Sequence, residues 1–380
     1  MNQKNKILHI ISGLGKGGAE KTLYRLILND QLFQHEVISL SNENFYKTKF
    51  EKINVSVKSL NLKRGKLSLV SIFKLIKFIK DSKPSIIHTW MYHSDLLGGL
   101  IGKLLGHKNI IWCVRNSSID KNFTSFKTRL VINLCVFFSK YIPKKIINCS
   151  KVSNQLHQNM GYPKEKCVVI NNGVDTNIYK PLTLNNENLK TILNIKDNKL
   201  ILGMVARWDA QKDLNTFLNA LKILKNETEH QWHAILVGNR LDQNNEQLLK
   251  DVDLRGLKNH ISLLGFKNNL VSIYNSFDVC VLTSAYGEGF PNVIAEAMSC
   301  GIPCIGTDVG DTKNIINNTG WIFSLKNSEE LKNQIKEIFE EIKQSKQWLL
   351  RKNLARERIV SNFTFSSMLK NYQSEWKNIL

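Results

Sequence analysis

The sequence predicts an α/β protein of two domains, each built on a parallel sheet. Short apolar runs typical of buried strands alternate with amphipathic stretches typical of helices, and this alternation begins again at Lys199. A chain of 380 residues, 42% of them apolar, can bury the two cores that such domains need. We expect an N-terminal domain at 1–180, a C-terminal domain at 181–362 and a closing helix at 363–380.

The first predicted strand, Lys6 to Ile11, leads into a glycine-rich loop at Gly13 to Gly18 and then into the helical AEKTLYRLIL. The loop reads G-x-G-x-G-G, which differs from the dinucleotide fingerprint G-x-G-x-x-G, and no strand with a ribose-binding acid follows about 20 residues later. A hydride-transfer enzyme is therefore unsupported. A tight turn without a ligand remains an alternative.

The strands HEVISL and SIIHTW flank a predicted helix at KLSLVSIFKLIKFIKDS. Its apolar residues at helical spacing are expected to face inward, with a basic face on the other side; they are Leu69, Ile72, Phe73, Ile76 and Ile79. The basic face is either simply solvated or in contact with a membrane surface. His88 and His93 lie near the end of the second strand, where a side chain can reach a ligand.

The strand in IIWCVRNSS places Arg115 and Asn116 at the edge of a site. The run LVINLCVFF, within 126–141 and flanked by lysines, is too short to span a bilayer. We expect a core helix there, with a helix that dips into a membrane edge as the alternative. Ser150 then caps a helix, and KCVVINNGVDTNIYKP closes the first domain.

The second domain opens after a polar, Asn-rich connection at 182–198. Arg207 and Lys212 bracket a turn between the strand LILGMVARW and the next helix, so two cations converge beside a helix start, as a diphosphate would require. The further strands HAILVGN, ISLLGF (ending at Phe266) and DVCVLTS lead to the most informative stretch of the chain.

That stretch runs from Ser284 to Gly310 as a strand exit, loop, helix and strand. Gly287 and Gly289 free the backbone around Glu288, Pro291 suits the first turn of a helix, and Glu296 lies two turns further on. Unpaired amides at a helix start accept an anionic or polar ligand. With carboxylates beside them, the pattern indicates a phosphorylated sugar, unless both acids are merely solvated.

The net charge of +21 lies almost entirely in the first half of the chain, where residues 1–180 hold 29 Lys and Arg against 10 Asp and Glu. Such a surface suits nucleic acid, anionic lipid or a phosphate-bearing substrate. No nucleic-acid-binding motif is present, so we expect no nucleic acid partner. Seven scattered cysteines indicate reduced thiols, and no stretch predicts a signal peptide or a membrane span. These features predict a cytoplasmic protein.

Four motifs carry a resemblance to a known family. The E-x7-E pattern from Glu288 to Glu296 with the following EAMSCGIPCIGTDVGD, the RWDAQKD turn, the GKGGAEK loop and the NNGVD segment are similar to the retaining GT-B glycosyltransferases of family GT4. The resemblance covers essentially the whole chain and is strongest from residue 199 onward. It implies the GT-B fold, in which two Rossmann-like domains with parallel sheets face across a cleft and the C-terminal helix crosses back.

The resemblance also implies the site. It assigns catalytic roles to Glu288, His93, Arg207 and Lys212. Trp90 occupies a place where many family members have a histidine, so either His93 or His88 contacts the sugar, and we favour His93. The donor would be bound by Gly15, Gly17, Gly18, Arg207, Lys212, Phe266, Glu288, Gly289, Phe290, Pro291, Asn292, Val293 and Glu296. Arg115 and Asn116 would face the acceptor.

The function implied is transfer of a hexosyl or N-acetylhexosaminyl group, with retention, from a nucleotide-diphosphate sugar, in the first place a UDP-sugar. The nucleotide-sugar is a co-substrate, and neither cofactor nor metal is expected. The acceptor would be a saccharide, such as a polyprenyl-linked one of cell-surface polysaccharide biosynthesis, met at the inner face of the plasma membrane. Two alternatives stay open: a GT-B nucleotide-sugar 2-epimerase and a non-enzymatic basic binding protein.

Overall fold

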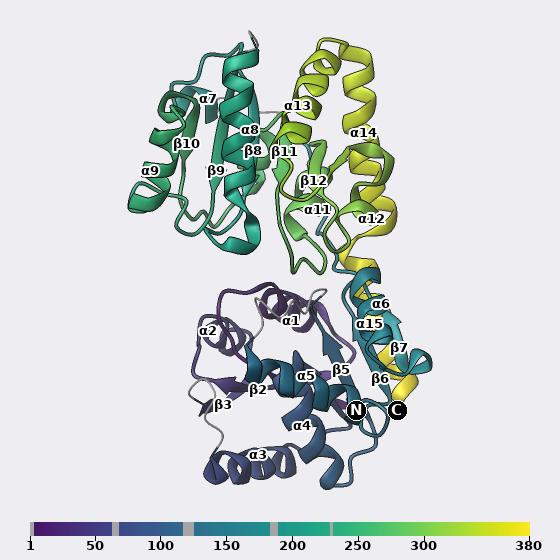
Figure 1. The fold of residues 1–380 in the computed structure, drawn as a ribbon. Coiled ribbons are helices and arrows are strands. Elements are labelled where there is room, and N and C mark those ends of the chain that lie inside the picture. Colours follow the sequence, from purple (N-terminus) through teal and green to yellow (C-terminus); the bar gives the residue numbers. More distant parts are fainter. Residues whose placement is uncertain (1–3, 63–67, 117–124, 183–188, 229–230) are drawn as a thin grey trace. The chain divides into compact units, whose positions relative to one another are not determined.

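The computed structural model describes residues 4–62, 68–116, 125–182, 189–228 and 231–380. It divides into two compact units (Figure 1). Unit 1 consists of Met1–Asn172 together with Ser366–Leu380, and unit 2 consists of Gly173–Phe365. The sequence placed these divisions at 180 and 362, so unit 2 begins earlier than expected, and the closing helix that was expected to cross back to the first domain belongs to unit 1.

Unit 1 contains a seven-stranded parallel sheet in the order β3-β2-β1-β4-β5-β6-β7. The parallel α/β architecture that the sequence predicts is confirmed. The strands are β1 (Lys6–Ile11), β2 (Gln34–Ser41), β3 (Ser56–Leu62), β4 (Ile86–Trp90), β5 (Ile110–Val114), β6 (Lys145–Asn148) and β7 (Cys167–Val169).

The helices of unit 1 cover both faces of this sheet. Leu8 and Ile10 of β1 face a core shared with α3, α4 and α5, whereas His9 faces the opposite side, because strand side chains alternate. The helices are α1 (Gly18–Asn29), α2 (Lys47–Glu51), α3 (Leu69–Ser82), α4 (Tyr92–Leu104), α5 (Phe126–Phe138), α6 (Lys151–Asn159) and α15 (Phe365–Ile379), with a short 3-10 turn at η1 (Lys164–Lys166).

Beneath α15 lies a buried polar chain. The Trp90 indole donates to Nδ1 of His9 (3.2 Å), His9 bonds to His35 (2.9 Å), and His35 bonds to Asp30 (2.9 Å). Because the indole can only donate, Nδ1 of His9 accepts and the proton of His9 is on Nε2. His9 Nε2 therefore donates to His35 Nδ1, and His35 Nε2 donates to Asp30. On α15 itself, Trp376 Nε1 donates to Nδ1 of His88 at 3.2 Å. Burial lowers the pKa of His88 to about 3 and that of His9 well below its ordinary value.

One prediction about the helices of unit 1 is wrong in part and another is wrong. On α3, Ile79 is buried and Ile72 and Ile76 pack against the core, as predicted. Leu69 and Phe73, by contrast, are 74% and 68% exposed, and the buried positions are Ser71, Leu75, Ile79 and Ser82. On α5 the only fully buried residues are Ile132 and Cys135, so it is a surface helix and not a core helix. Both segments hold more apolar residues than one packed face can cover. In the described ranges, no helix combines the length and apolarity of a membrane span.

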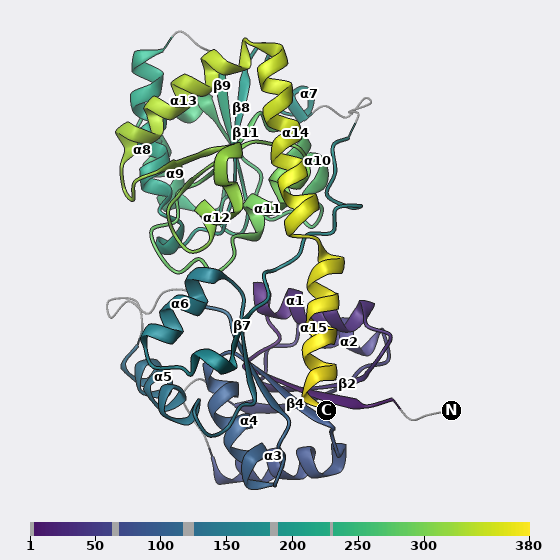
Figure 2. The same cartoon turned by 90° about the vertical axis from the view of Figure 1, so that its right-hand side faces the viewer.

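Unit 2 contains a six-stranded parallel sheet in the order β10-β9-β8-β11-β12-β13. Its strands are β8 (Leu200–Val205), β9 (Trp232–Val237), β10 (Ile261–Leu263), β11 (Val279–Leu282), β12 (Cys304–Thr307) and β13 (Trp321–Phe323). Helices pack on both faces, over two apolar clusters. Figure 2 shows this arrangement from the side.

Two helices of unit 2 begin at residues suited to helix starts: Asp213 caps α8 and Pro291 directly precedes α11. They are α7 (Leu189–Ile192), α8 (Leu214–Glu227), α9 (Glu246–Leu254), α10 (Val271–Asn275), α11 (Asn292–Ser299), α12 (Thr312–Ile316), α13 (Ser328–Ile342) and α14 (Ser345–Asn362), with 3-10 turns η2 (Ala210–Lys212), η3 (Lys258–His260) and η4 (Asn317–Thr319).

Candidate functional site

The sheet of unit 2 reverses its strand order between β8 and β11, which are neighbours in the sheet but far apart in the chain. From β8 the chain proceeds through α8 to β9 on one side, and from β11 it proceeds to β12 on the other. The loops after these two strands therefore diverge at the carboxyl edge, which is where ligands of open α/β sheets bind. Lys212 follows β8 and Glu288 follows β11.

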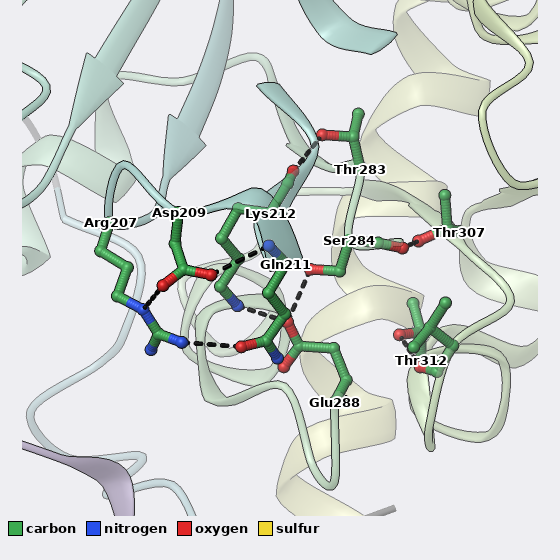
Figure 3. Close-up of polar contacts among 10 residues, drawn as sticks. Arg207, Asp209, Gln211, Lys212, Thr283, Ser284, Glu288, Thr307 and Thr312 are labelled. Atoms are coloured by element: carbon green, nitrogen blue, oxygen red, sulfur yellow. Dashed lines mark hydrogen bonds and ion pairs between the residues drawn. The ribbon is translucent and has the colours of Figure 1, made fainter. Parts of the chain in front are cut away.

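At this point Lys212 and Glu288 form an ion pair, 76 positions apart in sequence (Figure 3). Lys212 Nζ donates to Oε1 of Glu288, and Ser284 Oγ donates to the same oxygen at 2.6 Å. The side chains of the pair are 13% and 9% exposed. The sequence predicted both charged residues for the site, but it did not predict that they bond to each other or that Ser284 joins them.

The two loops that carry this pair are joined by their backbones. The Ala285 amide donates to the Gln211 carbonyl at 2.8 Å, and Thr283 Oγ1 donates to the Lys212 carbonyl at 2.8 Å. A further hydrogen bond runs from Thr307 Oγ1 to the Ser284 carbonyl. These bonds fix the position of the lysine relative to the glutamate, so the site is held together before any ligand binds.

Arg207 lies beside the pair and is held from two sides. Its Nε donates to Asp209 at 3.1 Å and its Nη2 donates to Gln211 at 2.7 Å, while 54% of the side chain stays exposed. Figure 3 shows Gln211 between Arg207 and Glu288. An oriented, solvent-facing guanidinium next to a lysine is suited to the oxygens of a diphosphate.

The loop around Glu288 depends on a glycine in a neighbouring segment. Gly310 has φ +58°, and a Cβ there would lie 2.0 Å from the Glu288 carbonyl oxygen. The amide of Asp311 donates to the Gly289 carbonyl at 3.0 Å. The backbone at Gly310, after β12, therefore packs directly against the backbone of the Glu288 loop and supports it. Only glycine permits so close an approach.

The start of α11 presents backbone groups more than side chains. Pro291 is its N-cap and gives no side-chain cap. The Phe290 ring is buried against Phe363, 5.5 Å between centroids, so only its backbone can face a ligand. Asn292 and Val293 are partly exposed on the first turn. A helix start of this kind is where anionic and hydroxyl-bearing ligands commonly bind.

Glu296 is set deeper than expected. Its side chain is buried within α11 and accepts a hydrogen bond from the Tyr274 hydroxyl at 3.2 Å. Burial first, and then the charge of Glu296, raises the pKa of Tyr274. Phe266 lies beyond β10 at the same edge of the sheet and is 52% exposed. No sequence signal pointed to Tyr274 as a partner of the second acid.

Unit 1 has its own reversal of strand order, between β1 and β4. The loop with Gly15, Gly17 and Gly18 follows β1, and His93 lies in the first turn of α4 after β4. Ser12 and Ser94 join the two exits through their hydroxyls at 3.1 Å. The predicted glycines and His93 thus lie at the carboxyl edge of this sheet, the edge where ligands of open α/β sheets usually bind.

Two acids that the sequence analysis did not consider adjoin the glycine loop. A Cβ on Gly15 would lie 2.7 Å from a Glu43 carboxylate oxygen, and one on Gly17 would lie 2.2 Å from Glu20. Burial raises the pKa of Glu20. Carboxylates around this loop favour a ligand that brings hydroxyl groups as well as phosphate.

The structure separates the two candidate histidines. His88 is fully buried in β4 and bonded to Trp376, whereas His93 is exposed at the start of α4. Arg115 donates to Thr22 and Asn172 at 3.0 and 2.6 Å, and Asn116 is exposed. Among these predicted residues, His93 and Asn116 are exposed, whereas Arg115 is held within unit 1 by the two hydrogen bonds of its Nη2.

Comparison with protein families gives two matches that together span most of the chain. Residues 16–178 match the model described as Glycosyltransferase Family 4, and residues 185–352 match the model described as Glycosyl transferases group 1. The boundary between the matches falls close to the boundary between units 1 and 2.

Individual relatives are similar at modest identity. The chain is 27% identical over 262 residues to the Escherichia coli UDP-Gal:alpha-D-GlcNAc-diphosphoundecaprenol alpha-1,3-galactosyltransferase, covering 69% of this chain and 66% of the relative. It is 25% identical over 334 residues to the Campylobacter jejuni N,N'-diacetylbacillosaminyl-diphospho-undecaprenol alpha-1,3-N-acetylgalactosaminyltransferase, covering 84% and 85%.

Solved structures agree with the fold. A crystal structure of Anabaena HepE in complex with UDP superposes with a TM-score of 0.83 at 21% identity, covering 98% of this chain and 100% of that one. A glycosyltransferase from Rickettsia africae gives a TM-score of 0.81 at 21% identity, covering 100% and 99%. With the family matches in both units, the chain belongs to the GT4 glycosyltransferases and has the GT-B fold.

Proposed function

We propose that this protein is a retaining glycosyltransferase that moves a sugar from a UDP-sugar to a lipid-linked saccharide in cell-surface polysaccharide biosynthesis. The observation that carries the proposal is the Lys212–Glu288 pair at the strand-order reversal of unit 2, with Arg207 beside it. The E. coli relative is named for a UDP-sugar donor and a diphosphoundecaprenol acceptor. The C. jejuni relative is likewise named for a diphospho-undecaprenol acceptor.

In this proposal the donor diphosphate lies against Arg207 and Lys212. Negative charge grows on the departing diphosphate as the bond from the sugar to phosphate breaks, and two fixed cations stabilise that charge more than they stabilise the bound donor. Glu288 accepts hydrogen bonds from sugar hydroxyls, and Glu296 holds the ribose. Lys212 thus exchanges part of its contact with Glu288 for a phosphate oxygen.

Retention would follow from attack on the same face that the diphosphate leaves. The bond between the anomeric carbon and the phosphate oxygen breaks, the acceptor oxygen bonds to that carbon, and its proton passes to the departing phosphate. No covalent sugar–protein intermediate is required. Because the two cations already neutralise the diphosphate, we propose that transfer needs no metal ion, and full activity in EDTA tests this.

A nucleotide-release assay across UDP- and GDP-sugars, with and without a polyprenyl-diphosphate saccharide, tests the function. We expect the wild type to release UDP only when the acceptor is present and to form an α-linked product, detected by NMR, from an α-linked donor. Glu288→Gln should neither release UDP nor form the product. Conversion of free nucleotide-sugar without acceptor would instead identify an epimerase. A protein that binds no nucleotide diphosphate in a thermal-shift panel would not be an enzyme of this class.

A further inference from the structure

Helix α5 carries a continuous apolar stripe on its outer side. Phe126, Leu130, Leu134 and Phe137 are 73%, 52%, 38% and 59% exposed. They recur at i, i+4, i+8 and i+11, so at 100° per residue they occupy a band about 80° wide. Ile132 and Cys135 hold the opposite side of the helix in the core. The side chains that point outward are therefore as apolar as those that point inward.

Cations border this stripe on both sides. On the same helical projection Lys127 lies about 20° beyond one edge and Arg129 about 60° beyond the other. Lys140 follows the end of the helix at Phe138 by two residues, and both lysines are exposed. Arg129 lies over the Phe126 ring at 5.9 Å. From residue 125 to residue 145 the chain has five Lys and Arg and neither Asp nor Glu. An apolar band flanked by cations, with no acid nearby in sequence, is the pattern of a helix that lies in a membrane interface.

We propose that the stripe, defined by Phe126, Leu130, Leu134 and Phe137, docks onto a bilayer of anionic phospholipid, with α5 parallel to the membrane surface. The apolar side chains enter the headgroup and acyl boundary, and Lys127 and Lys140 pair with lipid phosphates. The excess of cations in residues 1–180 adds attraction to the same surface. A protein partner would need acidic groups around an apolar groove, whereas a bilayer supplies both features along the whole helix.

The place of α5 in the fold connects docking to catalysis. A helix that follows a parallel strand begins at the carboxyl edge of the sheet, and α5 follows β5. Phe126 therefore lies toward the edge that carries His93, and Figure 2 shows α5 at the outer side of unit 1 next to α4. Docking would bring that edge to the membrane surface, where a lipid-linked acceptor presents its saccharide. This step rests on the proposed function, but binding to lipid does not.

Co-sedimentation of the full chain with vesicles tests the proposal. We expect binding to vesicles of phosphatidylglycerol and phosphatidylcholine, much weaker binding to phosphatidylcholine alone, and loss of binding as salt rises. Leu130→Asp/Phe137→Asp should reduce the partition coefficient at least tenfold. Lys127→Gln/Lys140→Gln should reduce it about fivefold per residue, since one cation at an anionic surface contributes about 1 kcal/mol.

The matched control is Leu349→Asp/Leu350→Asp on α14 of unit 2, whose side chains are 59% and 58% exposed. It adds the same charge and should bind vesicles like the wild type. Equal loss in the control, or unchanged binding in the α5 variant, would overturn the proposal. So would light scattering that shows a dimer broken by the α5 substitutions, because the stripe would then serve a second copy.

Two further measurements separate docking from catalysis. Glu288→Gln should bind vesicles normally, and Leu130→Asp/Phe137→Asp should keep its turnover of a short-chain, water-soluble acceptor while losing activity toward a long-chain acceptor in vesicles. If Glu288→Gln stays active but vesicle binding behaves as expected, the proposed function fails and the docking surface stands.

Discussion

Lys212→Met should destabilise unit 2, and adding Glu288→Gln to the same chain should restore about half of the lost stability. The lysine is the cation bonded to a Glu288 side chain that is only 9% exposed. Without it the carboxylate keeps the hydrogen bond from Ser284 but faces no cation at that oxygen. A largely desolvated carboxylate without a cation destabilises the folded state, whereas the neutral amide of a glutamine at the same position does not.

The size of the effect lies between two limits. Exposed ion pairs contribute about 0–1 kcal/mol, and breaking a fully buried pair costs about 3–5 kcal/mol. Side chains that are 13% and 9% exposed at the edge of a sheet fall between these cases. We expect Lys212→Met to cost about 2 kcal/mol, or about 4–8 °C in Tm for a domain of this size. Glu288→Gln alone should cost about 1 kcal/mol, because the lysine can turn toward solvent.

The assay is a double-mutant cycle by thermal and urea unfolding of the wild type, both single variants and the double variant. The double variant should be about as stable as Glu288→Gln, which gives a coupling free energy of about 2 kcal/mol. All three variants should be inactive, so stability and catalysis separate within one set of proteins. Additive losses, with a coupling free energy near zero, would refute the inference that the pair holds the unliganded site together.

Three other predictions concern the histidines and the glycine support. Burial lowers the folded-state pKa values of His88 and His9, so below pH 6.5 the unfolded chain takes up protons before the folded one does. The free energy of unfolding of unit 1 should therefore fall by about 1.4 kcal/mol per pH unit per histidine toward acid and stay constant above pH 7. Unchanged hydrogen-exchange protection of β4 at pH 5, after correction for intrinsic rates, would contradict this. His93→Ala should lower kcat about a hundredfold with little change in Tm, whereas a variant whose Tm falls and whose kcat does not would place this residue in the structure. Gly310→Ala should weaken UDP binding about tenfold by titration calorimetry, because a Cβ there would lie 2.0 Å from the Glu288 carbonyl oxygen and would push the Glu288 loop away. Wild-type affinity in this variant would count against the support that we assign to Gly310.

The sequence predicted the parts of the fold that short-range signals control. The strand from Lys6 to Ile11 has the predicted bounds, since a short apolar run between a polar start and a glycine loop permits little else. Pro291 marks the start of α11 as predicted, although it is the N-cap residue and not a member of the first turn. Lys212 and Glu288 could each be expected near a ligand because each follows a strand at the same edge of the sheet.

What the sequence could not predict depends on distant contacts. His88 looked available for a ligand at a strand end, but Trp376 covers it from 288 positions away. The stripe on α5 is as apolar as the buried side of that helix, so periodicity alone could not tell which side faces the core. Glu43 and Glu20 lie beside the glycine loop only in the folded protein, because no sequence motif links either acid to that loop.

Unit 1 is assembled from both ends of the chain, and this affects synthesis on the ribosome. Residues up to 172 emerge first, but α15, whose Tyr372 and Trp376 are fully buried in unit 1, is translated only after all of unit 2. Until then the aromatic and histidine surface that α15 covers stays open to water in the nascent protein. Unit 2 can therefore complete its core during translation before α15 is made, whereas unit 1 reaches its final state only once α15 packs onto it.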